Sequence, residues 1–330
     1  MKVNYNNSRD ISFNGFWGSK FAKKSLEFAS NNGALFAATT TLALSTGVRT
    51  GSILLTPKTD KENKKIACAK SITSGILEFA LTLAISAPIA AAFKKIDANP
   101  AKYIKQDSLK TLSDNLPNLK ESKAYSLATQ LFKLGLGFAV VFPKAILTSI
   151  GIPLVLGKTK NIENEEKEKN VQDLNFKGNG SEILPKTLGK ILDNKALQDF
   201  AVKHKNSNFP MHIFALKDIL ATGAFIHQAK INKKINEEQK PFLIKNSILS
   251  TTLSLISSYT IDKYTDKQAQ KIINKIKVEN INDPNLAKYI EGFKIVKPIM
   301  ILALVYYTVI PILSTFLAQI SENIKNNRTN

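Results

Sequence analysis

The chain has 330 residues, which is long enough for two ordinary domains or one large domain. Lys and Arg number 46 against 26 Asp and Glu, so the formal net charge is +20. Apolar residues lie in long blocks with charged residues between them, a distribution that excludes a disordered chain. Cys68 is the only cysteine, which excludes a small secreted domain held by internal disulfides. The pattern is typical of a membrane protein.

The N-terminal region combines aromatic and basic residues. The first ten residues are polar and hold no short apolar core, so we expect no cleaved signal peptide. In residues 11–31, Phe13, Trp17, Phe21 and Phe28 are interleaved with lysines at helical spacing. An aromatic face opposite a basic face is typical of a helix lying in the membrane interface. An ordinary helix packed on its neighbours fits the pattern equally well.

Six apolar segments follow, and a membrane-crossing helix needs about 20 mostly apolar residues. The last segment carries no charge, and Tyr306 and Tyr307 lie at its centre, where interfacial anchoring does not explain them. The third contains Pro143 and Pro153, so we expect a broken helix there. The alternative is a soluble protein with buried helices, but these runs lack polar residues at a 3.6 period. We predict an all-α, integral, multi-pass membrane protein with segments at residues 33–55, 71–93, 134–156, 210–227, 246–261 and 298–318.

The two halves of the chain resemble each other. Residues 44–47 (LSTG) recur as residues 220–223 (LATG), and residues 97–104 (DANPAKYI) recur as residues 283–290 (DPNLAKYI). Chance similarity between helices rich in Ala, Ser, Lys and Ile is the alternative, but the matches keep a common order. We therefore predict a first unit over residues 1–156 and a charged linker over 157–173. The second unit covers 174–330 and begins with an amphipathic helix over 183–204.

The number of segments in each unit has a consequence for topology. If all three segments of each unit cross the membrane, the second unit enters from the opposite side. That arrangement is an inverted repeat, which is common in secondary transporters. Lys and Arg are spread almost equally over the two sides of such a six-span arrangement, so loop charge does not choose an orientation. Re-entrant segments are the alternative to six full spans.

Several charged residues lie inside the apolar segments, where a charge usually faces protein or water and has a partner. Arg49 and Glu78 lie about 10 Å below the same surface of a helical hairpin, so they form a candidate ion pair. Lys144, Lys217 and Asp218 form a candidate intramembrane polar site, with Lys144 and Asp218 as the expected contact. The alternatives are a purely structural ion pair and lysines that extend to the surface from shorter segments.

Recognisable catalytic and cofactor motifs are absent from the sequence. There is no phosphate loop, no H-E-x-x-H and no nucleophile elbow, and the three histidines are too widely spaced for a ligand pair. We therefore expect no enzyme activity, no cofactor and no metal. The expected partners are anionic lipids and a small solute or ion rather than nucleic acid, because lysines flank apolar segments instead of forming one face. The sequence favours a small transporter or channel-like protein, and the alternative is a non-enzymatic membrane-shaping scaffold.

Overall fold

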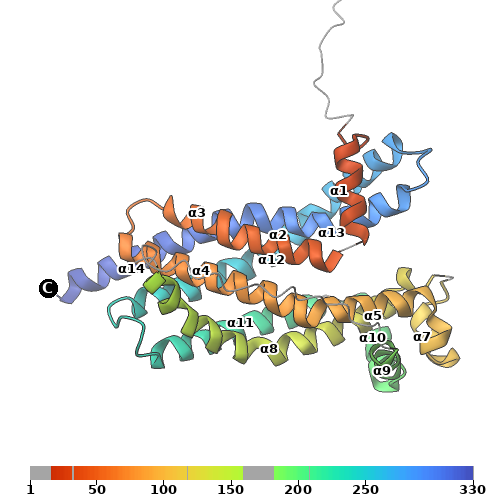
Figure 1. The fold of residues 1–330 in the computed structure, drawn as a ribbon, viewed down its shortest axis with the longest axis horizontal. Helices are drawn as coiled ribbons and strands as arrows, with labels where there is room; N and C mark the ends of the chain where they lie inside the picture. The colour runs from red at the N-terminus through yellow and green to blue at the C-terminus, as the bar shows by residue number, and fades with distance from the viewer. Residues whose placement is uncertain (1–15, 32, 117, 159–181, 208, 330) are drawn as a thin grey trace, which may run out of the picture.

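The computed structural model describes residues 16–31, 33–116, 118–158, 182–207 and 209–329. No strand occurs in these ranges, and six long helical rods run side by side (Figure 1). Three rods contain a short π-helical stretch, which separates two labelled α-helices. In chain order the rods are α2–α3 (Gly33–Ala43, Leu44–Val48, Arg49–Leu54), α4–α5 (Lys61–Leu81, Thr82–Ser86, Ala87–Ala98), α8 (Lys123–Lys158), α11 (Phe209–Ile231), α12 (Lys240–Glu279) and α13–α14 (Leu286–Ile301, Leu302–Val309, Ile310–Thr329).

Short helices gather at one end of the bundle, on the right in Figure 1, which we call the flanking end. They are α1 (Lys20–Asn31), α6 (Pro100–Tyr103), α7 (Gln106–Ser113), a 3₁₀ turn (Leu119–Glu121), α9 (Ile183–Leu192) and α10 (Lys195–His204). The opposite end, the loop end, carries the connections 55–60 and 232–239 and the end of α14. The helix expected over 183–204 is two helices, because Asn194 caps α10 by accepting a hydrogen bond from the backbone N–H of Leu197 at 3.2 Å.

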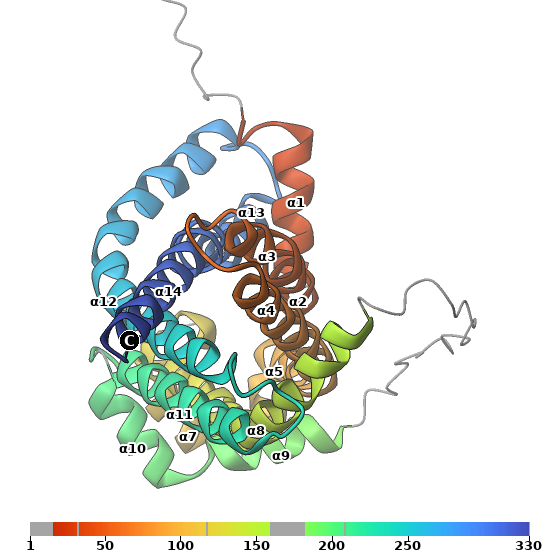
Figure 2. The ribbon, with the colours of Figure 1, turned by 90° about the vertical axis from the view of Figure 1, so that its left-hand side faces the viewer.

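The six rods form a closed ring, viewed along its axis in Figure 2. Each rod packs against the next in the sequence, and α13–α14 returns to pack against α2–α3. Apolar residues also point outward from every rod, as Leu54, Ile76, Phe142, Ile219, Ile256 and Leu304 show, each more than half exposed. Every rod therefore exposes at least one large apolar side chain on the outside of the ring.

The direction of the rods corrects the inverted repeat. Asn232 donates to the carbonyl oxygen of Ser149 at 2.8 Å, and Lys123 donates to Asn206 at 3.0 Å near the other end. Rods α8 and α11 therefore run parallel, since both progress from the flanking end to the loop end. The segments that the sequence matches between the two halves therefore point the same way within the described ranges, whereas an inverted repeat requires opposite directions.

Helix lengths also differ from the expected segments. Among the described residues, three helices are long and apolar enough to cross a membrane: Lys61–Ala98, Lys123–Gly157 and Ala303–Ile324. The segment expected at 246–261 is the middle of α12, which has 40 residues. Helix α8 continues through Pro143 and Pro153 without the expected break. Each proline removes one backbone hydrogen-bond donor, and the remaining hydrogen bonds of this 36-residue helix keep it continuous. The charged linker 157–173 lies almost wholly outside the described residues.

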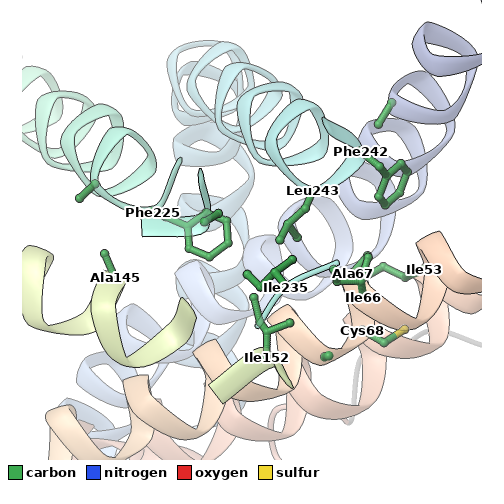
Figure 3. Close-up of a cluster of buried hydrophobic side chains, with 14 of the residues drawn as sticks. Ile53, Ile66, Ala67, Cys68, Ala145, Ile152, Phe225, Ile235, Phe242 and Leu243 are labelled. Atoms are coloured by element: carbon green, nitrogen blue, oxygen red, sulfur yellow. The ribbon is translucent and has the colours of Figure 1, made fainter. Parts of the chain in front are cut away.

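The apolar core divides along the bundle. At the loop end one cluster joins all six rods, with Ile66, Ile152, Phe225 and Leu243 among its members (Figure 3). At the flanking end there are two separate clusters. One joins α5 and α8 to α9 and α10, and the other joins α12 and α13 to α1. The rods are therefore closed together at the loop end and separate into two groups at the flanking end.

Candidate functional site

A cavity of about 690 Å³ lies inside the ring, and residues from all six rods line it. This volume lies within the range of small-molecule binding sites. The apolar cluster at the loop end forms its floor, since Ile53, Ala145 and Phe225 belong to both. Serine and threonine side chains make up much of the remaining wall. Because charged side chains line this cavity while apolar side chains lie on the outside of the ring, we take it as the candidate site.

Two of the three π-helical stretches supply residues to the cavity wall. In the first, the carbonyl oxygen of Ser45 accepts a hydrogen bond from the hydroxyl of Ser71 at 2.7 Å. In the third, Tyr306 and Tyr307 both face the cavity, and the hydroxyl of Tyr306 donates to the carbonyl of Ser254 at 3.3 Å. Such stretches displace side chains from the regular helical positions and occur often at functional sites. The central tyrosines of the last segment therefore have a place in the protein interior.

The acidic residues of the cavity each have a basic partner. The carboxylate of Glu78 on α4 forms an ion pair with Lys144 on α8. Asp218 lies 3.4 Å from Lys217, its neighbour on α11. The Glu78–Lys144 pair takes the place of the Arg49–Glu78 pair expected from the sequence. The expected contact between Lys144 and Asp218 is likewise replaced, because each residue has another partner.

Two further cations face the cavity, Arg49 on α3 and Lys70 on α4. Nη2 of Arg49 donates to the hydroxyl of Ser250 at 3.2 Å. Nζ of Lys70 donates to the hydroxyl of Ser247 at 2.6 Å and lies 4.3 Å from the ring centre of Phe225. Within the described part of the chain, neither cation forms an ion pair with a carboxylate. The four cations and two carboxylates leave the cavity with a formal charge of +2.

The five residues singled out in the sequence all line this one cavity: Arg49, Glu78, Lys144, Lys217 and Asp218. Sequence reasoning missed Lys70, because this residue directly precedes the apolar segment that begins at residue 71. Helix α4 begins ten residues earlier than that segment, so Lys70 lies inside the helix and turns to the cavity. The helical phase of Lys70 relative to Glu78, eight residues on, is the signal that places both on one face.

Metal binding has no support in the described ranges, where no group of three His, Cys, Asp or Glu side chains lies close enough to hold an ion. Comparison with protein-family models, curated proteins and solved structures finds no match for this chain. The function is therefore argued from the cavity and its surroundings.

Proposed function

We propose that the protein is a membrane transporter whose solute-binding site is the central cavity. The observation that carries the proposal is the combination of a charged interior with an apolar outer surface on the same ring of helices. Soluble helical bundles usually bury their large apolar side chains and expose their ion pairs. Lipid around the ring and a polar solute within it account for both features.

The division of the core fits a cavity open to one side of a membrane. The apolar cluster at the loop end closes the floor, while the two clusters at the flanking end hold separate groups of rods. Movement of the two groups about the cavity would open the floor and close the flanking end. Alternating access of this kind requires two modules packed around one site.

The two modules correspond to the two halves of the sequence repeat, arranged in parallel. Helix α1 of the first half packs on α13 of the second, and α10 of the second half packs on α8 of the first. Lys288 of the second AKYI motif pairs with Glu27 of α1 at 3.5 Å, and Lys102 of the first pairs with Glu182 at 3.1 Å. This exchange of flanking helices is what a two-fold axis along the bundle produces. Parallel repeats of this kind occur among secondary transporters.

The orientation of α1 supports a bundle axis along the membrane normal. In both views α1 lies perpendicular to the rods (Figures 1 and 2). A helix in that position lies in the plane of the interface when the rods cross the bilayer.

Accessibility of single cysteines at the two ends tests the proposal. In a Cys68→Ser background, Glu62→Cys and Glu238→Cys are matched positions at the loop end, both exposed, and Asp107→Cys is exposed on α7 at the flanking end. We expect a membrane-impermeant maleimide to label the first two from one side of sealed vesicles and the third from the other. Labelling of all three from one side would show that the rods do not cross the membrane and would overturn the transporter.

A membrane-bound scaffold is the second candidate, and the outer face of α1 favours it. Phe21 is 73% exposed and Phe28 is 46% exposed, and Lys20 and Lys24 lie exposed beside them. Exposed aromatic rings next to lysines are typical of a helix bound to anionic lipid. A scaffold needs this face but has no use for the charged cavity.

Vesicle binding tests this candidate separately. We expect Phe21→Ser with Phe28→Ser to weaken binding to vesicles that contain phosphatidylglycerol, and added salt to weaken binding of the parent protein. The matched control is Phe142→Ser, which removes an exposed ring from a rod rather than from α1. If the α1 variant and the control bind alike, α1 is not a lipid-binding helix.

A further inference from the structure

We propose that Arg49 and Lys70 form the binding site for an oxyanion, the carboxylate or phosphate group of a small solute. This inference rests on the proposed function, since it names the chemical class of what occupies the cavity. It assigns the two cations that the protein itself leaves without an acidic partner in its described part.

The first argument is electrostatic. Arg49 and Lys70 lie on adjacent antiparallel rods, and Lys70 is within electrostatic reach of both Arg49 and Lys144. Cations held close together inside a protein repel one another and have lost part of their hydration. Lys144 is neutralised by Glu78, whereas Arg49 and Lys70 contact only hydroxyl groups and one aromatic ring. An anion in the cavity supplies the missing charge.

The second argument is the kind of donor present. Arg49 presents a planar fork that matches the two oxygens of a carboxylate or phosphate, and Lys70 adds a compact charge. Their present partners, Ser250 and Ser247, lie one turn apart on the same face of α12. The Ser250 hydroxyl accepts from Arg49 and keeps its own hydrogen for an anion, whereas the Ser247 hydroxyl donates to the carbonyl oxygen of Leu243 at 2.6 Å. Tyr307 also faces the cavity, near Arg49.

The third argument is size. The cavity of about 690 Å³ is far larger than inorganic phosphate needs, so a charged group bound by Arg49 and Lys70 leaves room for an organic body. Val141 and Phe225, which also line the cavity, supply apolar contact for such a body. A soluble organic anion and an anionic lipid headgroup share this chemistry, and the experiment separates them.

The test measures thermal unfolding of the full chain in neutral detergent with added inorganic phosphate or citrate, at constant ionic strength set by choline chloride. We expect either anion to raise the unfolding midpoint of the parent protein. Lys70→Met should weaken the apparent affinity about tenfold, the loss expected for one charge-assisted contact. Lys65→Met is the matched control, because Lys65 is exposed on the same helix and pairs with Glu62 outside the cavity.

A second readout separates an anion site from a structural lysine. If Lys70 binds an anion, Lys70→Met raises the unfolding midpoint in buffer without phosphate or citrate, because the substitution removes an unneutralised cation from the interior. If Lys70 is structural, the same change lowers the midpoint and leaves the response to phosphate intact, which would overturn the proposal. Glu78→Gln releases Lys144 from its partner and should strengthen anion binding at least threefold. This variant keeps the test decisive if Lys70→Met fails to fold.

The source of the anion is read in nanodiscs. Phosphatidylglycerol in place of phosphatidylcholine should weaken the effect of citrate if the site binds a lipid headgroup, and leave it unchanged if the site binds a soluble solute. Either result supports the site. Absence of any anion response in detergent and in nanodiscs overturns it. Anion binding without flux in proteoliposomes would overturn the proposed transport function and keep the proposed anion site. Flux that stays unchanged in Arg49→Gln and Lys70→Met would overturn the anion site and keep the transport function.

Discussion

Nζ of Lys70 lies 2.6 Å from the hydroxyl of Ser247, a residue 177 positions further along the chain. Lys70 lies on α4 and Ser247 on α12, so the contact joins two rods that both run from the loop end to the flanking end. Ser247 follows Ser71, the neighbour of Lys70, by the same 176 residues that separate LSTG at 44–47 from LATG at 220–223. The proposed parallel repeat places two such helices side by side in the same direction. The cavity lies at the centre of this arrangement, with most of its charge contributed by the first half.

The ion pair between Glu78 and Lys144 should contribute to stability. Glu78→Gln leaves Lys144 without a carboxylate, and we expect the free energy of unfolding to fall by about 1 kcal/mol. The loss is smaller than for a fully buried pair because the Glu78 side chain is 47% exposed. Chemical unfolding in detergent without polyvalent anions measures the change. Lys144→Met added to Glu78→Gln should restore most of the loss, and fully additive losses would show that the two side chains do not interact.

Stability at low pH should depend on Asp114, which ends α7 at φ 54° and lies outside the rods. Its carboxylate accepts hydrogen bonds from Lys205 at 2.5 Å, from the Ser122 hydroxyl at 3.1 Å and from the Ala124 N–H at 3.3 Å. Burial alone would raise the pKa of Asp114, but these hydrogen bonds outweigh burial and lower the pKa below its ordinary value of 3.8.

The direction of this shift sets the sign of the pH dependence. Because the pKa of Asp114 is lower in the folded state, its contribution is complete above pH 3.8 and is lost as the pH falls further through the folded-state pKa. Asp114→Asn should lower stability at pH 7 by about 1 kcal/mol and flatten the acid limb of the unfolding curve. Asparagine adopts positive φ readily, so the backbone is preserved. An unchanged acid limb in the variant would contradict this role.

Docking of α1 should depend on Gly292, where α13 and α1 touch. A Cβ at this position would lie 2.6 Å from the backbone carbonyl carbon of Leu26, so Gly292→Ala forces α1 away. The only tryptophan, Trp17, packs edge-on against Phe293 with ring centres 5.5 Å apart, and it reports this movement. We expect a red shift of the tryptophan emission. Gly223→Ala is the matched control, because no atom lies within 4 Å of the added Cβ. Equal spectra from both variants would refute the tight contact.

Transport should depend on Asp218, which neutralises Lys217 in the cavity wall. Asp218→Asn adds one positive charge, so it should hold a bound anion more tightly and slow its release. In proteoliposomes loaded with the anion that gives the largest thermal shift, we expect flux to fall at least tenfold while membrane insertion stays intact. Asp199→Asn on exposed α10 serves as control. Normal flux from Asp218→Asn would remove Asp218 from the transport mechanism.

Most of the charged residues in the cavity wall stand out in the sequence, because charges inside apolar segments are costly and therefore few. Arg49, Glu78, Lys144, Lys217 and Asp218 stand out in the sequence for that reason, and all five line the cavity. Their pairing was not predictable. Packing of α4 against α8 brings Glu78 to Lys144, and Arg49 on α3 reaches Ser250 on α12 with its long side chain. Both contacts join residues far apart in the chain.

Helix ends were harder to predict than helix centres. The apolar segment at 246–261 marks only the middle of α12, whose polar ends remain helical to Lys240 and Glu279. Polar residues such as Lys, Gln and Glu are good helix formers. High hydropathy therefore marks only the apolar part of the helix, and the helix continues beyond it. For the same reason Lys70 was not predicted as a cavity residue, since it precedes an apolar segment but lies inside α4.

The sequence by itself determined that the protein is helical and that long apolar segments surround a few charged residues, and the resemblance of its halves stays a prediction. These properties follow from local composition and period, which neighbouring residues impose on one another. Only the tertiary structure decided the direction of the second half and the partners of Arg49, Lys70 and Glu78. The direction depends on how α11 packs beside α8, and the partners depend on which rods become neighbours in the ring. The direction and the partners both depend on packing over the whole molecule, which cannot be predicted from a local sequence pattern.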